Sequence, residues 1–179
     1  MTEKPAILIV DDTPEMVTIV ERLLRAHYRT RTASSGKEAL AMVRAGPPDL
    51  VLLDVMMPGM SGFEVCRELK ARAETKDIPV IFLTALDDVK DEKIGFEAGA
   101  VDYITKPISQ PILLARVKNH LALKAAADFL KDKNRYLTAE VARRTEQLQI
   151  IQDVTIMAMA SLAETRDNAT GNHIRRTQN

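Results

Sequence analysis

Short apolar runs alternate with amphipathic segments over the first two thirds of the chain. The apolar runs lie at residues 6–10, 29–33, 49–54, 79–84 and 101–105, and helical patterns lie between them at 14–27, 36–45, 62–74 and 88–98. Three of the five runs have almost no polar alternation, as expected of strands that are covered on both faces. The pattern predicts an α/β fold with a five-stranded, doubly wound parallel sheet.

The character of the chain changes near residue 111. All eight prolines lie at or before Pro111, and residues 112–170 contain neither proline nor glycine. From residue 127 to residue 162 a mostly apolar stripe follows alternating steps of three and four, with Asn134 and Arg144 as polar interruptions. This heptad pattern predicts a long helix that forms a parallel dimeric coiled coil over residues 127–162. The alternative is a long helix that packs on another domain.

Composition and charge restrict the partners and the cellular compartment. Lys plus Arg and Asp plus Glu number 25 each, and no local basic patch stands out, so we expect no direct contact with nucleic acid. A single cysteine, Cys66, excludes an intramolecular disulfide and fits a reducing compartment. No apolar run reaches 18 residues, so we expect no membrane segment and a cytoplasmic location.

Polar side chains stand where four of the predicted strands end. They are Asp11, Asp12, Asp54, Thr84 and Lys106. In a doubly wound sheet the carboxyl ends of the strands form the ligand-binding rim. Three carboxylates at this rim would repel one another unless a cation lay among them, and hard oxygen ligands suit Mg²⁺. A hydroxyl and an ammonium opposite them would hold a phosphoryl group. Each residue alone also fits a structural role, such as a solvated turn. The prediction therefore rests on the occurrence of all five residues at the ends of strands in one sheet.

The motifs around these residues identify a family. They read "VDD", "LLDVMMPGMSG", "FLTA" and "YITKP", and through them residues 5 to about 122 resemble the receiver domain of bacterial two-component response regulators. The resemblance implies that Asp54 accepts a phosphoryl group from a histidine kinase or a phosphotransfer protein. It also implies a Mg²⁺ site formed by four groups, namely Asp11, Asp12, Asp54 and the backbone carbonyl of Met56.

The resemblance assigns further roles around the phosphoacceptor. Thr84 and Lys106 are expected to bind the phosphoryl group, and Tyr103 to turn inward when the Thr84 hydroxyl moves to that group. The side chains of Met56 and Leu86 are expected to set the lifetime of the acyl phosphate by shaping the path of water. The alternative for Tyr103 is an ordinary half-buried residue of a strand.

The last residues suggest a different family. The stretch "ETRDNATGNHIRRTQ" resembles the opening of HD-GYP domains, which are metal-dependent cyclic-di-GMP phosphodiesterases, and we expect a new helix to begin near Gly171. The resemblance points to His173 as a residue of the output metal site, although Ala169 replaces a glutamate found in some members. The chain contains no His-Asp and no Gly-Tyr-Pro sequence, so we expect it not to hydrolyse cyclic-di-GMP itself.

These observations predict three parts: a receiver domain at residues 1–122, a dimeric signalling helix at 123–163, and the truncated start of an HD-GYP-like output domain at 164–179. The expected function is a phosphorylation-dependent response regulator, with no enzymatic activity beyond its own phosphotransfer and dephosphorylation. Its signal would pass to a cyclic-di-GMP phosphodiesterase. The alternatives are a stand-alone adaptor that acts by protein binding and the receiver of a diguanylate cyclase.

Overall fold

The fold of the chain is centred on one parallel sheet. The computed structural model describes residues 4–85, 95 and 97–176, with side chains up to residue 162. Five parallel strands lie in the order β2-β1-β3-β4-β5. Their bounds are β1 Ala6–Val10, β2 Arg29–Ala33, β3 Leu50–Asp54, β4 Val80–Thr84 and β5 Asp102–Thr105. The predicted α/β class and doubly wound sheet are confirmed, and each strand begins within one residue of its predicted start.

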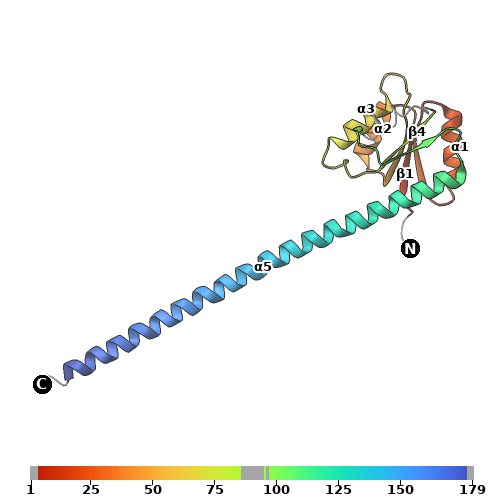
Figure 1. Cartoon of the computed structure of the whole chain (residues 1–179). Helices are drawn as coiled ribbons and strands as arrows, with labels where there is room; N and C mark the ends of the chain where they lie inside the picture. The colour runs from red at the N-terminus through yellow and green to blue at the C-terminus, as the bar shows by residue number, and fades with distance from the viewer. Residues whose placement is uncertain (1–3, 86–94, 96, 177–179) are drawn as a thin grey trace. The chain divides into compact units, whose positions relative to one another are not determined.

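Helices connect the strands and cover both faces of the sheet (Figure 1). Their bounds are α1 Pro14–Leu24, α2 Gly36–Ala45, α3 Gly62–Lys70 and α5 Gln110–Arg176. Most of the helix predicted at 88–98, and Leu86 with it, lies outside the described residues. Within the described part of the chain, no helix has both the length and the apolar character that a bilayer span requires.

Two helices are shorter than their sequence patterns suggest. Helix α1 ends at Leu24 rather than at residue 27, and a turn follows in which the amides of His27 and Tyr28 both donate to the Leu24 carbonyl, at 2.9 and 3.0 Å. Helix α3 ends at Lys70 rather than at residue 74. There the hydroxyl of Thr75 donates to the carbonyl of Leu69 at 2.6 Å, so a side chain takes a terminal acceptor of the helix.

The hydrophobic core has two halves, one on each face of the sheet. Alternate residues of a strand point to opposite faces, so Ile7 and Ile9 lie in one half and Leu8 and Val10 in the other. Val20 and Leu24 of α1, with Leu113 and Val117 of α5, complete the first half. Residues of α2 and α3 complete the second: Ala39, Leu40, Val43, Val65, Cys66 and Leu69. Burial on both faces explains why β1, β3 and β4 are almost purely aliphatic.

The N-terminus of α3 is fixed against the end of β3. Ser61 caps the helix in a capping box, in which its Oγ accepts from the amide of Glu64 and the Glu64 carboxylate accepts from the Ser61 amide. The next residue, Gly62, donates its amide to the carbonyl of Val55 at 2.9 Å. A Cβ on Gly62 would lie 2.1 Å from the carbonyl oxygen of Asp54. Only glycine fits this approach.

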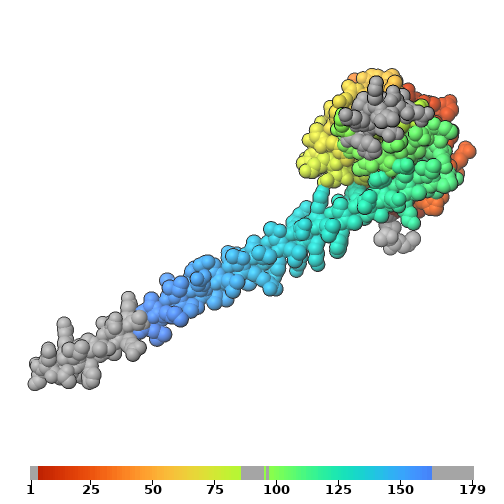
Figure 2. Space-filling model, viewed as in Figure 1, coloured from red at the N-terminus to blue at the C-terminus, as the bar shows by residue number. Residues whose placement is uncertain are grey.

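Helix α5 begins in the core and continues as a single element. Its side chains at Leu113 and Val117 are fully buried, whereas the large apolar side chains from Phe129 to Leu162 are exposed. Figure 2 shows the surface of the later, blue part of this helix. The chain divides into compact units at residues 1–128 and 129–179. The boundaries predicted at 122 and 163 stay predictions. The prediction of a new helix at Gly171 is wrong, since α5 runs unbroken to Arg176 and one glycine costs a helix only about 1 kcal/mol.

We expect Gly62→Ala to destabilise the first unit by about 1–3 kcal/mol, because the added methyl group forces β3 and α3 apart. Urea denaturation monitored by circular dichroism measures the change. Gly46→Ala is the matched control, since the nearest atom to its Cβ is the flexible Arg31 Nη1 at 3.6 Å. Equal unfolding midpoints for the two variants would contradict the close approach.

Candidate functional site

Four strands deliver the candidate residues to one rim. Asp11 follows β1, Asp54 and Thr84 are the last residues of β3 and β4, and Lys106 follows β5. These four strands are neighbours in the sheet, so their carboxyl ends lie next to one another. The structure therefore brings together the residues that the sequence placed at strand ends. Their chemical roles depend on the contacts that their side chains make.

Three carboxylates form a compact cluster at this rim. One oxygen from each of Asp11, Asp12 and Asp54 lies within 4.8 Å of the others. Asp11 and Asp54 are buried, with 1% and 5% of their surface exposed, whereas Asp12 is exposed. Asp11 is further fixed because its Oδ1 accepts from the amide of Thr13 at 2.9 Å. The cluster thus has two buried acids and one side open to solvent.

The ammonium group of Lys106 joins the two buried acids. Its Nζ lies 2.9 Å from Asp11 Oδ2 and 2.7 Å from Asp54 Oδ1. The backbone of Lys106 is held as well, since its amide donates to the carbonyl of Thr84 at 2.7 Å. Burial by itself lowers the pKa of Lys106, but the hydrogen bonds to Asp54 and Asp11 outweigh burial, and the pKa is raised. The lysine therefore stays charged between them.

The surroundings of Asp54 disfavour the charged form of its carboxylate. Burial raises the pKa of Asp54 above its usual value, the hydrogen bond from Lys106 opposes the rise, and the charges of Asp11 and Asp12 add to it. The net shift is upward, with burial as its largest cause, and three carboxylates share this rim with one ammonium. A second cation among them would offset the repulsion, and clustered carboxylate oxygens are the donors that Mg²⁺ prefers. The residues present therefore fit a Mg²⁺ site.

The acidic pair borders a pocket on the side of α1. A surface pocket of about 260 Å³ is lined by Asp11 and Asp12 together with residues of α1 and of the end of β2. Met56, two residues beyond Asp54, has a side chain that is 69% exposed. The use of its carbonyl as a metal ligand stays a prediction. The cluster thus joins two buried acids to one exposed acid that borders the pocket.

The remaining predicted residues are placed as follows. Thr84 is buried at the end of β4, with 7% of its surface exposed. Tyr103 pairs with Phe82 of β4 in the sheet register and packs partly buried against the α2–α3 half of the core. Their roles in switching stay predictions. Leu86 and the side chain of His173 lie outside what the structure describes.

The sequence prediction missed a second polar cluster next to Tyr103. Asp102, the first residue of β5, binds Arg116 and His120 of α5 with its carboxylate. The spacing of four residues between Arg116 and His120 places both on one face of a helix, which was the available signal. The spacing alone gave no reason to connect that face with Asp102.

Comparisons with known proteins agree with this geometry. The family model for the response regulator receiver domain matches residues 7–118. A probable cyclic di-GMP phosphodiesterase of Vibrio cholerae is 51% identical over 172 residues, which are 96% of this chain and 39% of that protein. The response regulator PleD of Caulobacter vibrioides is 47% identical over 128 residues, 71% of this chain and 28% of PleD. The chain therefore spans well under half the length of these two relatives.

Solved structures show the same fold. A putative response regulator from Chloroflexus aurantiacus is 40% identical, with a TM-score of 0.65, and the match covers 67% of this chain and 99% of that one. The chemotaxis protein CheY4 of Vibrio cholerae is 30% identical, with a TM-score of 0.62, over 65% of this chain and 98% of that one.

We expect Asp12→Asn to weaken Mg²⁺ binding at least about tenfold, because the variant removes one ligand charge from a site of three carboxylates. Isothermal titration of Mg²⁺ into both proteins measures the affinity. Glu74→Gln removes one exposed carboxylate outside the cluster and serves as the control. If Asp12→Asn binds Mg²⁺ as tightly as this control, the acidic pair is only a turn.

Proposed function

The chain belongs to the response regulator receiver family, and on this premise we propose that it is a phosphorylation-dependent response regulator with Asp54 as its phosphoacceptor. The observation that carries the proposal is the convergence of Asp54 with two further carboxylates and with the ammonium of Lys106 at one rim. No other described group of three acidic or histidine ligands meets in this way within the residues searched.

The geometry supports transfer from a phosphohistidine of a histidine kinase or a phosphotransfer protein. A carboxylate oxygen of Asp54 attacks the phosphorus in line, the P–O bond forms, and the P–N bond to the donor imidazole breaks. Lys106 Nζ is already 2.7 Å from Asp54 Oδ1, so it is positioned to neutralise the oxygens of the arriving group. Bound Mg²⁺ would supply further charge stabilisation at those oxygens.

The same proposal assigns the switch and its duration. Thr84, at the rim beside Lys106, is proposed to bind the transferred phosphoryl group, and Tyr103 to move inward as the Thr84 hydroxyl shifts. Met56 and Leu86 are proposed to control the access of water to the acyl phosphate. The exposed side chain of Met56 next to Asp54 supports this role for the first of the two.

A second copy of the chain is the proposed partner of α5. Large apolar side chains along residues 127–162 are exposed, and those of Val141, Leu148 and Ile151 are each more than 60% exposed. A lone helix with so much apolar surface is unfavourable in water, and a parallel dimer would bury the stripe. Arg144 interrupts the stripe.

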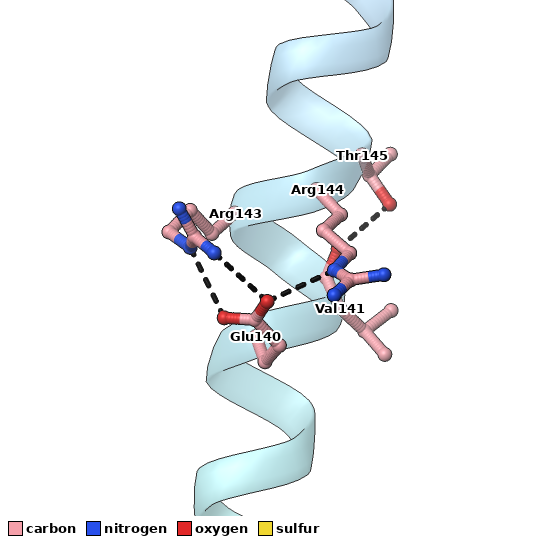
Figure 3. Close-up of polar contacts among 5 residues, drawn as sticks. All are labelled: Glu140, Val141, Arg143, Arg144 and Thr145. Carbon is pink, nitrogen blue, oxygen red and sulfur yellow. Dashed lines mark hydrogen bonds and ion pairs between the residues drawn. The ribbon is translucent and has the colours of Figure 1, made fainter.

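Figure 3 shows that the guanidinium of Arg144 pairs with a carboxylate on its own helix. The carboxylate of Glu140 accepts from Arg144 Nε at 2.9 Å and from Arg143 Nη2 at 2.8 Å. The guanidinium of Arg144 therefore bends back along the helix toward Glu140. This contact supports the proposed dimer, because Arg144 needs no partner in the opposite strand.

The proposed output is a cyclic-di-GMP phosphodiesterase of the HD-GYP type. The Vibrio cholerae relative with that printed activity aligns with 172 of the 179 residues, so the similarity extends along α5 into the segment that resembles the start of an HD-GYP domain. The match to PleD covers only 71% of the chain. We propose that the receiver controls such an output through α5, with His173 at its metal site and the protein in the cytoplasm.

We expect wild type to gain one phosphoryl group when it is incubated with Mg²⁺ and acetyl phosphate, and Asp54→Asn to gain none, because the amide is not a nucleophile toward phosphorus. Intact-mass spectrometry measures the gain. Asp132→Asn, which removes an exposed carboxylate on α5, is the control and should be phosphorylated like wild type. Phosphorylation of Asp54→Asn to the same extent would refute the assignment.

We expect the double variant Leu137→Glu, Leu148→Glu to be monomeric where wild type is dimeric, since each carboxylate buried without a partner costs several kcal/mol. Sedimentation velocity over a concentration series gives the oligomeric state. Ala139→Glu with Ala142→Glu adds the same charge outside the stripe and should leave the dimer intact. A monomeric wild type at tens of micromolar, or a dimeric Leu variant, would rule out this helix as the dimer interface.

A further inference from the structure

Asp102 ties strand β5 to helix α5 through both of its carboxylate oxygens. Arg116 Nη1 donates to Oδ1, and His120 Nε2 lies 3.1 Å from Oδ2. The amide of Tyr103 also donates to Oδ1, at 2.9 Å. Arg116 and His120 are one helical turn apart, so one carboxylate of β5 holds two consecutive turns of α5.

The contact joins charged and polar groups and is partly shielded from solvent. The side chains of Asp102 and His120 are 15% and 17% exposed, and that of Arg116 is 40% exposed. Burial alone would raise the pKa of Asp102, but the hydrogen bonds from Arg116, from the Tyr103 amide and from His120 hold the pKa below its usual value. Asp102 is therefore a fixed anion at the junction of β5 and α5.

Arg116 makes a second contact, which connects this junction to Tyr103. Its guanidinium carbon lies 6.0 Å from the centroid of the Tyr103 ring, within the range of a cation–π interaction. The ion pair with Asp102 fixes the guanidinium, so the ring is held at one position relative to α5. In the same structure the ammonium of Lys106 is hydrogen-bonded to the carboxylate of Asp54.

We propose that Asp102, Arg116 and His120 form a clamp between β5 and α5, in which Arg116 is a positioning residue that holds the Tyr103 ring in the half-buried place observed here. This inference rests on the proposed function, because it takes Tyr103 as the residue that moves when Asp54 is phosphorylated. Inward movement of the ring breaks its stack on Arg116. The contacts that restrain α5 between Arg116 and His120 therefore differ between the two positions of the Tyr103 ring.

The clamp has a thermodynamic consequence at Asp54, 48 residues before Asp102 in the sequence. Because the Arg116 stack favours the observed place of the Tyr103 ring, removing the stack lowers the cost of moving the ring inward, and by linkage the phosphoryl site binds its ligand more tightly. A cation–π contact of ordinary strength corresponds to an increase of about two- to fivefold in affinity. A purely structural anchor for α5 would not depend on the ring.

A double-mutant cycle on the full chain distinguishes a clamp that acts through the Tyr103 ring from a purely structural anchor for α5. The probe is beryllofluoride with Mg²⁺, a phosphoryl analogue, and its bound ¹⁹F signal gives the affinity at Asp54. The cycle compares Arg116→Gln in wild type with Arg116→Gln in a Tyr103→Leu background. Lys118→Gln removes an equivalent charge from an exposed site on α5 and is the control. Arg116→Lys repeats the cycle if Arg116→Gln does not fold.

We expect Arg116→Gln to raise the beryllofluoride affinity about two- to fivefold when Tyr103 is present and to have no effect when Tyr103 is leucine. Hydrogen exchange of residues 112–122 should increase on adding beryllofluoride to wild type and to Lys118→Gln, and this response should be lost in Arg116→Gln. Equal effects of Arg116→Gln in the two backgrounds, or none in either, overturn the clamp. Absence of bound beryllofluoride in wild type overturns the proposed phosphoacceptor itself, and the clamp with it.

Discussion

A single ammonium group between two buried carboxylates is the interaction on which the site depends. Lys106 Nζ bonds to both Asp11 and Asp54, although burial and the neighbouring acids leave Asp54 with a raised pKa. Three carboxylates therefore share one rim with a single lysine, and their mutual repulsion costs folding free energy. A cation among them would offset this repulsion, and clustered carboxylate oxygens are donors that suit Mg²⁺.

The rest of the first unit holds these charges in place. The strand order sets β1 beside β3, which brings Asp11 and Asp54 together, and β5 beside β4, which brings Lys106 to the backbone of Thr84. At Gly62 the start of α3 approaches the carbonyl of Asp54 more closely than any side chain would permit. Both faces of the sheet are packed, so the backbone at the rim is supported from two sides.

Helix α5 belongs to two physical environments. Its first turns are part of the core and are also bound to β5 through Asp102. From Phe129 to Leu162 its large apolar side chains are exposed, and its ion pairs, such as those of Glu140, run along the helix itself. One helix therefore joins a buried first part to a second part with exposed apolar side chains.

The sequence by itself determined the strands, the class of fold and the residues at the strand ends. It did so because burial on both faces demands aliphatic runs, and because parallel strands must end at one rim. Tertiary structure alone decided that Lys106 bridges Asp11 and Asp54, and that Asp102 reaches Arg116 and His120. It also decided that α3 stops at Lys70 and that α5 passes through Gly171. These features depend on contacts between residues far apart in the chain or on which groups bond to the last carbonyls of a helix. The hydrophobic pattern of the sequence contains neither kind of information.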